Sequence, residues 1–172
     1  MIVVSIIGIL AATAIPPYLM WVQSAKVTAA MQFSEQLQGN INQFYKETQG
    51  FPADNKAAGL PAPKQLISPE IAKVDVENGA LQITFRSTTH QALADKQLSL
   101  RPVYVKDSPK TPVSWICGHT AVPEGMSVAG INRTDLPVAF LPVACRDTTK
   151  SVALADAPVQ TNEPQSQGDS DE

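Results

Sequence analysis

The chain has 172 residues, a formal net charge of −3, two cysteines and two histidines. This length accommodates one domain with extensions, and the charge gives no reason to expect a general nucleic-acid-binding protein. Two cysteines and two histidines are too few for a multi-cysteine zinc ribbon, and the 14 prolines argue against an all-helical bundle.

Charge is distributed unevenly along the chain. Residues 1–25 carry no charged side chain, and the first charged residue is Lys26. Residues 1–146 hold 12 basic and 10 acidic side chains, whereas residues 147–172 hold six acidic side chains and one lysine. The chain therefore divides into an apolar N-terminal segment, a slightly basic middle and an acidic C-terminal segment.

The N-terminal segment is apolar on all sides. As a helix, residues 1–25 would be about 37 Å long, which exceeds the ~30 Å hydrocarbon core of a bilayer. A secretory signal peptide would need a basic region near its start, but Ile-Val-Val follows Met1 directly and no Lys or Arg occurs before Lys26. A buried core helix of a soluble domain is a second alternative, although the segment has no polar face. The pattern favours a helix that spans a membrane or forms the core of a filament.

Helix-weakening residues interrupt this segment. Gly8 lies among bulky residues, and Pro16 and Pro17 follow it. Because proline lacks a backbone donor and clashes with the preceding turn, we expect a hinge between Gly8 and Pro16. The alternative is an ordinary membrane helix, in which glycine and proline are tolerated.

An amphipathic helix is predicted over residues 26–49, continuous with the apolar segment. Residues at spacings of three and four form a mostly apolar stripe, and polar side chains lie off it. Gly50 and Pro52 are expected to end the helix. The stripe consists of Val27, Ala30, Ser34, Leu37, Ile41, Phe44 and Thr48.

Residues 50–147 are predicted to form a globular α+β head. A proline-rich loop comes first, followed by a predicted hairpin. In residues 73–76 and 81–85, apolar and polar side chains alternate, and Asn78-Gly79 between them is a type I′ turn signal. A third strand is expected over 98–105, where Pro102 implies an edge or a bulge, and a fourth over 113–117. The four antiparallel strands would pack on the helical stripe as a roll.

Residues 148–172 are predicted to be a disordered acidic tail, because they are rich in polar residues and poor in large apolar ones. One interpretation is a solvated tail that has no function. The other is a surface-exposed extension that varies in sequence or is modified. Ser151, Ser166 and Ser170 are equivalent candidates for glycosylation. The triplet at 132–134 matches the N-glycosylation pattern, which is common by chance.

No catalytic constellation is evident, and the sequence predicts neither an enzyme, a cofactor nor a metal site. His90 and His119 have no nucleophile pattern near them. Four basic residues near the cysteines form a candidate basic patch, although scattered solvated charge is the simpler interpretation. They are Lys106, Lys110, Arg133 and Arg146.

Three motifs resemble type IV pilins of the IVa class. The run MIVVSIIGILAATAIPPY is similar to the N-terminal pilin helix. The motifs Ser-Trp-Ile-Cys at 114–117 and Leu-Pro-Val-Ala-Cys-Arg-Asp at 141–147 resemble the two cysteine motifs that close the C-terminal loop of pilins. Between these motifs, only the pattern of the elements matches.

The resemblance implies a mature chain that starts earlier. Family members begin with an N-methylated Phe and carry a Glu shortly before the Met with which this chain starts. We therefore expect a chain truncated before Met1, by trimming or by a misassigned start. The missing Glu pairs with the N-terminal amine of a neighbouring subunit, and no residue present is assigned that role.

The resemblance also implies a disulfide between Cys117 and Cys145. Such a bond fits a domain outside the cytoplasm and would contribute roughly 3–4 kcal/mol through chain entropy. The alternative is a pair of buried free thiols. A redox or metal role is disfavoured because the spacing suits neither.

By resemblance, the chain is a major pilin that polymerises through its N-terminal helix. Its partners would be further copies of itself, the inner membrane before assembly, the pilus assembly machinery, and DNA or a host surface. It would move from the inner membrane as a precursor to an extracellular pilus serving adhesion, twitching motility or DNA uptake. The alternatives are a minor pilin, a type II secretion pseudopilin and a filament-borne DNA receptor. Because major pseudopilins typically carry a calcium loop in place of a disulfide, the cysteines favour a pilin.

Overall fold

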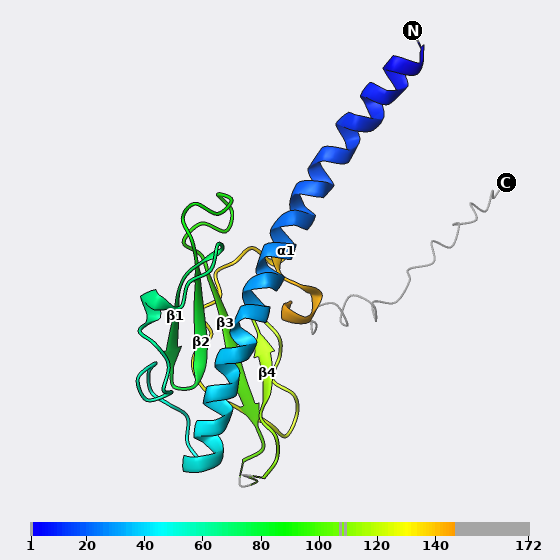
Figure 1. The fold of residues 1–172 in the computed structure, drawn as a ribbon. Coiled ribbons are helices and arrows are strands. Elements are labelled where there is room, and N and C mark those ends of the chain that lie inside the picture. Colours follow the sequence, from blue (N-terminus) through cyan, green and yellow to red (C-terminus); the bar gives the residue numbers. More distant parts are fainter. Residues whose placement is uncertain (1, 107, 109, 147–172) are drawn as a thin grey trace, which may run out of the picture.

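The fold is a long helix packed on an antiparallel sheet, as expected for an α+β roll (Figure 1). The computed structural model describes residues 2–106, 108 and 110–146. For residues 2–19 it describes the backbone, and the only side chain that it describes in this range is that of Val3. The predicted acidic tail at 148–172, with its three candidate serines, lies outside the described residues.

Helix α1 (Ile2–Thr48) has 47 residues and is therefore about 70 Å long. Its C-terminal half crosses the sheet, whereas its N-terminal half projects beyond the head (Figure 1). The buried positions recur every three or four residues and thus form one stripe. They are Gln23, Val27, Ala30, Ser34, Leu37, Ile41 and Tyr45.

The predicted stripe is confirmed from Val27 to Ile41 but is wrong at its end. Phe44 is only half-buried and Thr48 is exposed, whereas Tyr45 is 6% exposed. The ring of Tyr45 stacks on Phe51, with centroids 4.7 Å apart, and lies 5.7 Å from the ring of Tyr104. This aromatic contact, rather than the spacing along the helix, determines which of two adjacent residues the last turn buries.

Helix α1 ends one residue earlier than predicted. Gln49, and not Gly50, adopts the left-handed conformation, with φ of 58°. Its backbone N–H donates to the carbonyl of Tyr45 at 2.9 Å, and the N–H of Gly50 donates to the hydroxyl of Thr48 at 3.3 Å. These bonds satisfy groups that would otherwise be left unpaired at the helix end.

The sheet has antiparallel strands in the order β1-β2-β3-β4. The strands are β1 (Ile71–Glu77), β2 (Ala80–Phe85), β3 (Gln97–Tyr104) and β4 (Ser114–Cys117). The type I′ hairpin is confirmed, since Asn78 and Gly79 have φ of 49° and 85°. A fifth strand, β5 (Ser127–Val128), pairs with β3 and was not predicted, because two residues carry no alternating pattern.

Pro102 does not mark an edge strand, contrary to the expectation from sequence. It lies in β3, which has β2 on one side and β4 on the other. Pairing between β2 and β3 ends at Leu100, and the carbonyl of Pro102 accepts instead from the N–H of Ala129, at 3.0 Å. The missing N–H of proline therefore removes no bond between β2 and β3.

The core lies between α1 and one face of the sheet. Leu81, Ile83 and Phe85 of β2 face the helix, and Leu98 and Leu100 of β3 lie beside them in register. Trp115 of β4 donates its indole N–H to Asn42 of α1 at 3.2 Å, which joins the edge of the sheet to the helix.

The register at the end of the helical stripe is testable with neighbouring aromatic residues. Tyr45→Ala should lower the free energy of unfolding by about 3–5 kcal/mol, because it removes a buried ring from an aromatic cluster. Phe44→Ala should cost about 1 kcal/mol. Denaturant unfolding of the detergent-solubilised chain measures both values, and the reverse order would contradict the register.

Candidate functional site

The N-terminal half of α1 is the first candidate site, because it projects away from the sheet (Figure 1). Trp21 and Met20 are 68% and 50% exposed, and Val3 is also exposed. Exposed large apolar side chains on a single helix lower the free energy when they pack against another apolar surface. This part of α1 therefore has the chemistry of an interface.

A shallow hollow of about 380 Å³ follows Trp21 along α1. Its wall is formed by small side chains at helical spacing, bounded by one large residue at each end. These residues are Trp21, Ser24, Ala25, Thr28, Ala29 and Gln32. The hydroxyl of Thr28 donates to the carbonyl of Ser24 at 3.1 Å, so its polarity is partly satisfied within the helix. Small residues allow a second helix to approach closely.

The predicted hinge residues Gly8, Pro16 and Pro17 lie within α1, which is helical from Ile2 to Thr48. The structure describes the backbone of these three residues but not the contacts of their side chains. The hinge therefore remains a prediction about the assembled state. Among the residues whose side chains the structure describes, which exclude residues 2 and 4–19, no helix is long and apolar enough to cross a membrane.

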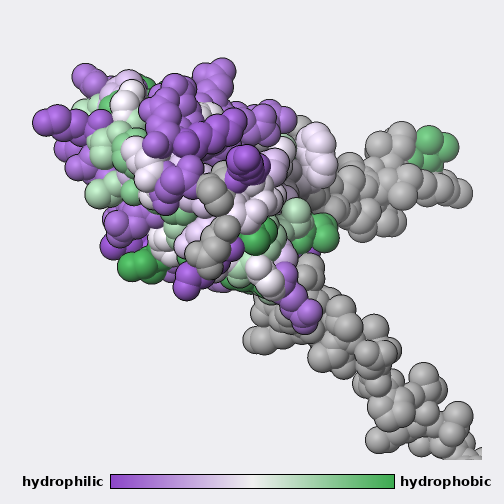
Figure 2. All heavy atoms as spheres, turned by 90° about the horizontal axis from the view of Figure 1, so that it is seen from below, coloured by the Kyte–Doolittle hydropathy of each residue, from purple (hydrophilic) through white to green (hydrophobic). Residues whose placement is uncertain are grey.

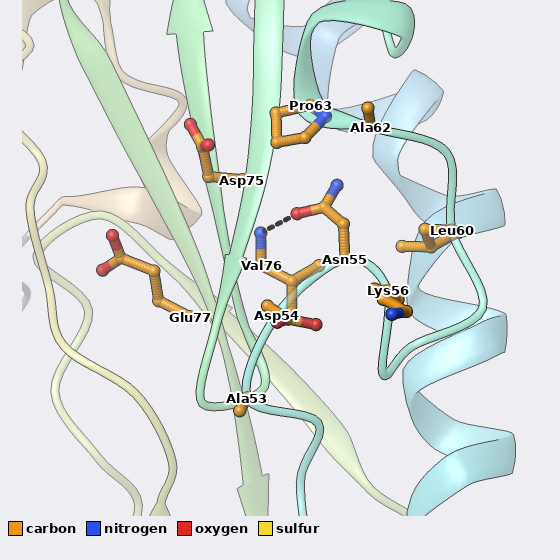
Figure 3. Close-up of a pocket in the computed structure, with 10 residues that line it drawn as sticks. All are labelled: Ala53, Asp54, Asn55, Lys56, Leu60, Ala62, Pro63, Asp75, Val76 and Glu77. Carbon is orange, nitrogen blue, oxygen red and sulfur yellow. Dashed lines mark hydrogen bonds between the residues drawn. The ribbon is translucent and has the colours of Figure 1, made fainter.

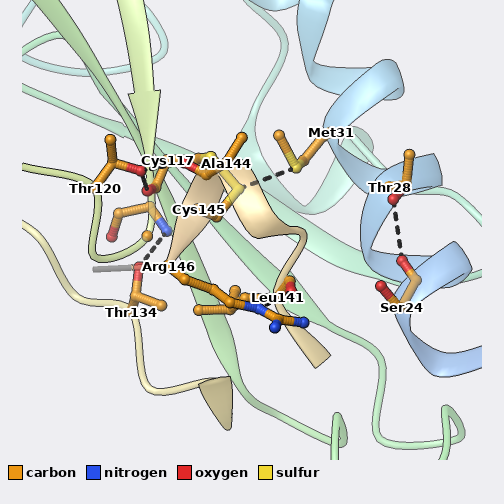
Figure 4. Close-up of a disulfide and its surroundings, with 12 residues drawn as sticks. Ser24, Thr28, Met31, Cys117, Thr120, Thr134, Leu141, Ala144, Cys145 and Arg146 are labelled. Atoms are coloured by element: carbon orange, nitrogen blue, oxygen red, sulfur yellow. Dashed lines mark hydrogen bonds between the residues drawn. A yellow bond between two sulfur atoms is a disulfide. The ribbon is translucent and has the colours of Figure 1, made fainter. Parts of the chain in front are cut away.

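The predicted disulfide between Cys117 and Cys145 is confirmed (Figure 4). It joins the end of β4 to the last short helix of the head, η3 (Val143–Cys145), and the two Cα atoms are 4.8 Å apart. The Sγ atom of Cys145 lies 3.6 Å from the Sδ atom of Met31 on α1. The bond therefore fixes the C-terminal segment beside the helix as well as beside the sheet.

Gly118 allows the two ends of the disulfide-bonded loop to meet. It has φ of 55°, and a Cβ atom at this position would lie 2.6 Å from the carbonyl oxygen of Cys145. The next residue, His119, donates its backbone N–H to this oxygen at 2.9 Å. The role of Gly118 was not predicted from the sequence, although a glycine directly after a cysteine was the available signal.

Between the cysteines, the chain crosses the sheet face that points away from α1. The carbonyl of Ile131 accepts from the side chain of Gln82 in β2 at 2.8 Å, and the N–H of Arg133 donates to the hydroxyl of Ser99 in β3 at 2.7 Å. At the start of β3, the side chain of Asp135 accepts from the N–H of Gln97. Periodicity does not predict this path, because side-chain hydrogen bonds hold it.

After this crossing, the chain returns to α1. Leu136 and Leu141 are buried in the core, on either side of the short helix η2 (Val138–Phe140), which packs against α1. The disulfide-bonded loop thus connects both faces of the sheet with the helix.

The four predicted basic residues have different surroundings. Arg133 forms an ion pair with Glu77 at 2.9 Å, and Arg146 donates from Nε to the carbonyl of Leu141 at 2.9 Å. Lys106 and Lys110 follow β3, and neither forms an ion pair with a described residue. Of the four, only Lys106 and Lys110 share a loop.

A second hollow lies between β1 and the loop at 53–63 (Figure 3). Asn55 bridges the edge of β1, accepting from the N–H of Val76 at 2.7 Å and donating to the carbonyl of Val74 at 3.0 Å. Its amide is therefore bonded to backbone groups at the edge of β1 that a further strand would need for pairing. Lys56 lies in this hollow with the carboxylates of Asp54, Asp75 and Glu77.

No residues arranged for catalysis stand out among those described. The ring of His90 accepts from the N–H of Ala92, and no group of three or more metal-ligating side chains is found within the described residues. On β3, the Nε atom of Arg101 is buried without a hydrogen-bond partner in that part of the chain. Burial lowers the pKa of Arg101, because desolvation disfavours its charged form.

These features define a subunit with a disulfide-closed head and a helix available for packing with other molecules. Residues 24–146 match the family model for pilins, described as forming a bacterial filament. The chain belongs to the pilin family, whose members are structural subunits rather than enzymes.

Individual relatives place it among the type IV pilins. It is 30% identical over 164 residues to the type IV major pilin protein PilE1 of Neisseria gonorrhoeae, covering 92% of this chain and 89% of that protein. It is 27% identical over 158 residues to a fimbrial protein of Neisseria meningitidis serogroup B, covering 87% and 91%. Fimbrial protein EcpC of Eikenella corrodens is 31% identical over 124 residues, covering 70% and 78%.

The close approach between Gly118 and Cys145 can be tested by replacing Gly118 and, as a control, Gly39 with alanine. Gly118→Ala should destabilise the head by more than about 1 kcal/mol, because it combines a left-handed conformation with a clash against Cys145. Gly39→Ala should stabilise it by about 0.5–1 kcal/mol, since a Cβ at Gly39 meets nothing within 4 Å. Thermal unfolding of the oxidised chain measures both, and equal shifts for the two variants would contradict the close approach.

Proposed function

We propose that this pilin polymerises into a surface filament by packing the N-terminal half of α1 against the same segment of neighbouring subunits. The observation that supports this most strongly is the exposure of two large apolar side chains, Met20 and Trp21, in the N-terminal half of α1. Within one subunit, the head covers only the later stripe of α1. Association of the uncovered half removes its apolar surface from water, which is the dominant favourable term in such packing.

The small-residue hollow gives this packing a specific contact. Ala25 and Ala29 leave room for a neighbouring helix, and the hollow lies where α1 enters the head. Helix interfaces with small residues gain van der Waals contact over their whole length. Before assembly, the apolar segment at 1–25 resides in the inner membrane, from which assembly machinery transfers it to the filament.

The proposed filament serves adhesion, twitching motility or DNA uptake. A DNA-receptor role needs a continuous basic surface, but the ion pair with Glu77 neutralises Arg133. The relatives named as major pilins and the confirmed disulfide support a major pilin over a pseudopilin.

Assembly is testable by filling the hollow. Ala25→Leu combined with Ala29→Leu should abolish or strongly reduce filament formation, because the added side chains prevent close approach of a second helix. The head should retain its unfolding midpoint, since both positions are exposed. The yield of sheared filaments, seen by electron microscopy from cells that produce this pilin, measures assembly.

The matched control is Gln36→Leu, which adds apolar area at an exposed position of α1 outside the hollow. It should assemble as the unsubstituted chain does. Normal filaments from the double variant would contradict packing through this face, whereas loss in both variants would indicate a general effect of added apolar area.

A further inference from the structure

A groove of about 590 Å³ lies between the last two turns of α1 and the loop that leads from β3 to β4. Asn42, Tyr45, Lys46 and Gln49 form one wall, and residues 110–113 form the other. This end of the head presents mainly hydrophilic side chains (Figure 2).

Two positively charged side chains line this groove. Lys46 comes from α1 and Lys110 from the loop, and neither forms an ion pair with a described residue. No acidic side chain is among the described residues that line it; Asp107, which belongs to the same loop, is not one of the described residues. The hollow at β1 differs in this respect, because its single lysine lies with three carboxylates. Two amines that meet no acidic side chain among the described residues of the groove favour an anionic occupant.

Two further donors in the groove form no hydrogen bond with the described residues. Asn42 accepts from Trp115 through Oδ1, which leaves its Nδ2 without a bond to the described residues. The hydroxyl of Tyr45 likewise makes no hydrogen bond there, although its ring is packed in the aromatic cluster. An occupant with carboxylate oxygens would satisfy both donors and both lysines.

The same chain contains a segment of complementary charge. Residues 147–172 carry a net charge of −5, and three of their six acidic side chains fall within 169–172. We propose that the acidic residues of 147–172 bind in this groove of their own subunit, with carboxylates of 169–172 beside Lys46 and Lys110.

The length of the segment permits this contact. Cys145 lies beside Met31, and 15 residues of α1 separate Met31 from Lys46, a distance of about 22 Å along the helix. The 23 residue-to-residue steps from Arg146 to Asp169 span up to about 75 Å when extended. Because the segment is tethered, its effective concentration at the groove is in the millimolar range.

The consequence of this contact is that the subunit's own carboxylates occupy the groove. Lys46 and Lys110 would be unavailable to external anions at moderate salt and would become available as salt screens the contact.

Zero-length carbodiimide cross-linking of the full chain in neutral detergent tests this contact, because it joins a carboxylate to an amine only at ion-pair distance. Peptide mass spectrometry should find amide links from Lys46 or Lys110 to acidic residues of 169–172. A mixture of ¹⁴N and ¹⁵N chains should give links within single chains. The links should be lost in 1 M salt, where the Debye length falls to about 3 Å.

Matched variants separate the groove from general charge attraction. Lys46→Gln with Lys110→Gln should remove these links, whereas Lys64→Gln, at an exposed lysine outside the groove, should preserve them. Links spread over all exposed lysines, links between chains, or none to the groove would overturn the proposal. So would equal binding of an acidic polysaccharide to the full chain and to a chain ending at Arg146, because the groove would then be open.

Discussion

The packing of one stripe of α1 against the sheet is the interaction on which the rest of the structure depends. Val27, Leu37, Ile41 and Tyr45 are buried on this stripe, and each large side chain contributes about 1.5–3 kcal/mol by leaving water. The sheet has only one face on this core, so without the helix its apolar side chains would be exposed. A 47-residue helix therefore acts both as core of the head and as an extension beyond it.

The disulfide-bonded loop completes this arrangement from the other side. Its path crosses the outer face of the sheet on side-chain hydrogen bonds and then returns to α1 through short helices of three residues each. Such short elements are not stable alone, because they form few backbone bonds of their own. The bond between Cys117 and Cys145 restricts the unfolded chain and fixes this segment beside Met31. The disulfide thus holds the C-terminal segment covalently within the head, and the contact with Met31 holds this segment to the helix by packing.

Sequence predicted the elements whose signals are periodic or local. The helical stripe from Val27 to Ile41, the hairpin at Asn78-Gly79 and the cysteine pair each follow from spacing, turn chemistry or a family motif. Tyr45, β5 and the path at 127–136 were missed because contacts distant in sequence determine them. Gly118 is an intermediate case. Its residue type could be read from the sequence, but its close approach to Cys145 could not.

The C-terminal half of α1 packs in the head, and we propose that the N-terminal half serves assembly. A chain that begins at Ala25 separates the two halves, and its state can be measured by sedimentation without detergent and by thermal unfolding. We expect a monomer whose unfolding midpoint stays within about 2–4 °C of the full chain, the shift expected for 1 kcal/mol in a protein of this size. Aggregation as strong as that of the full chain, or a much larger fall in the midpoint, would contradict it.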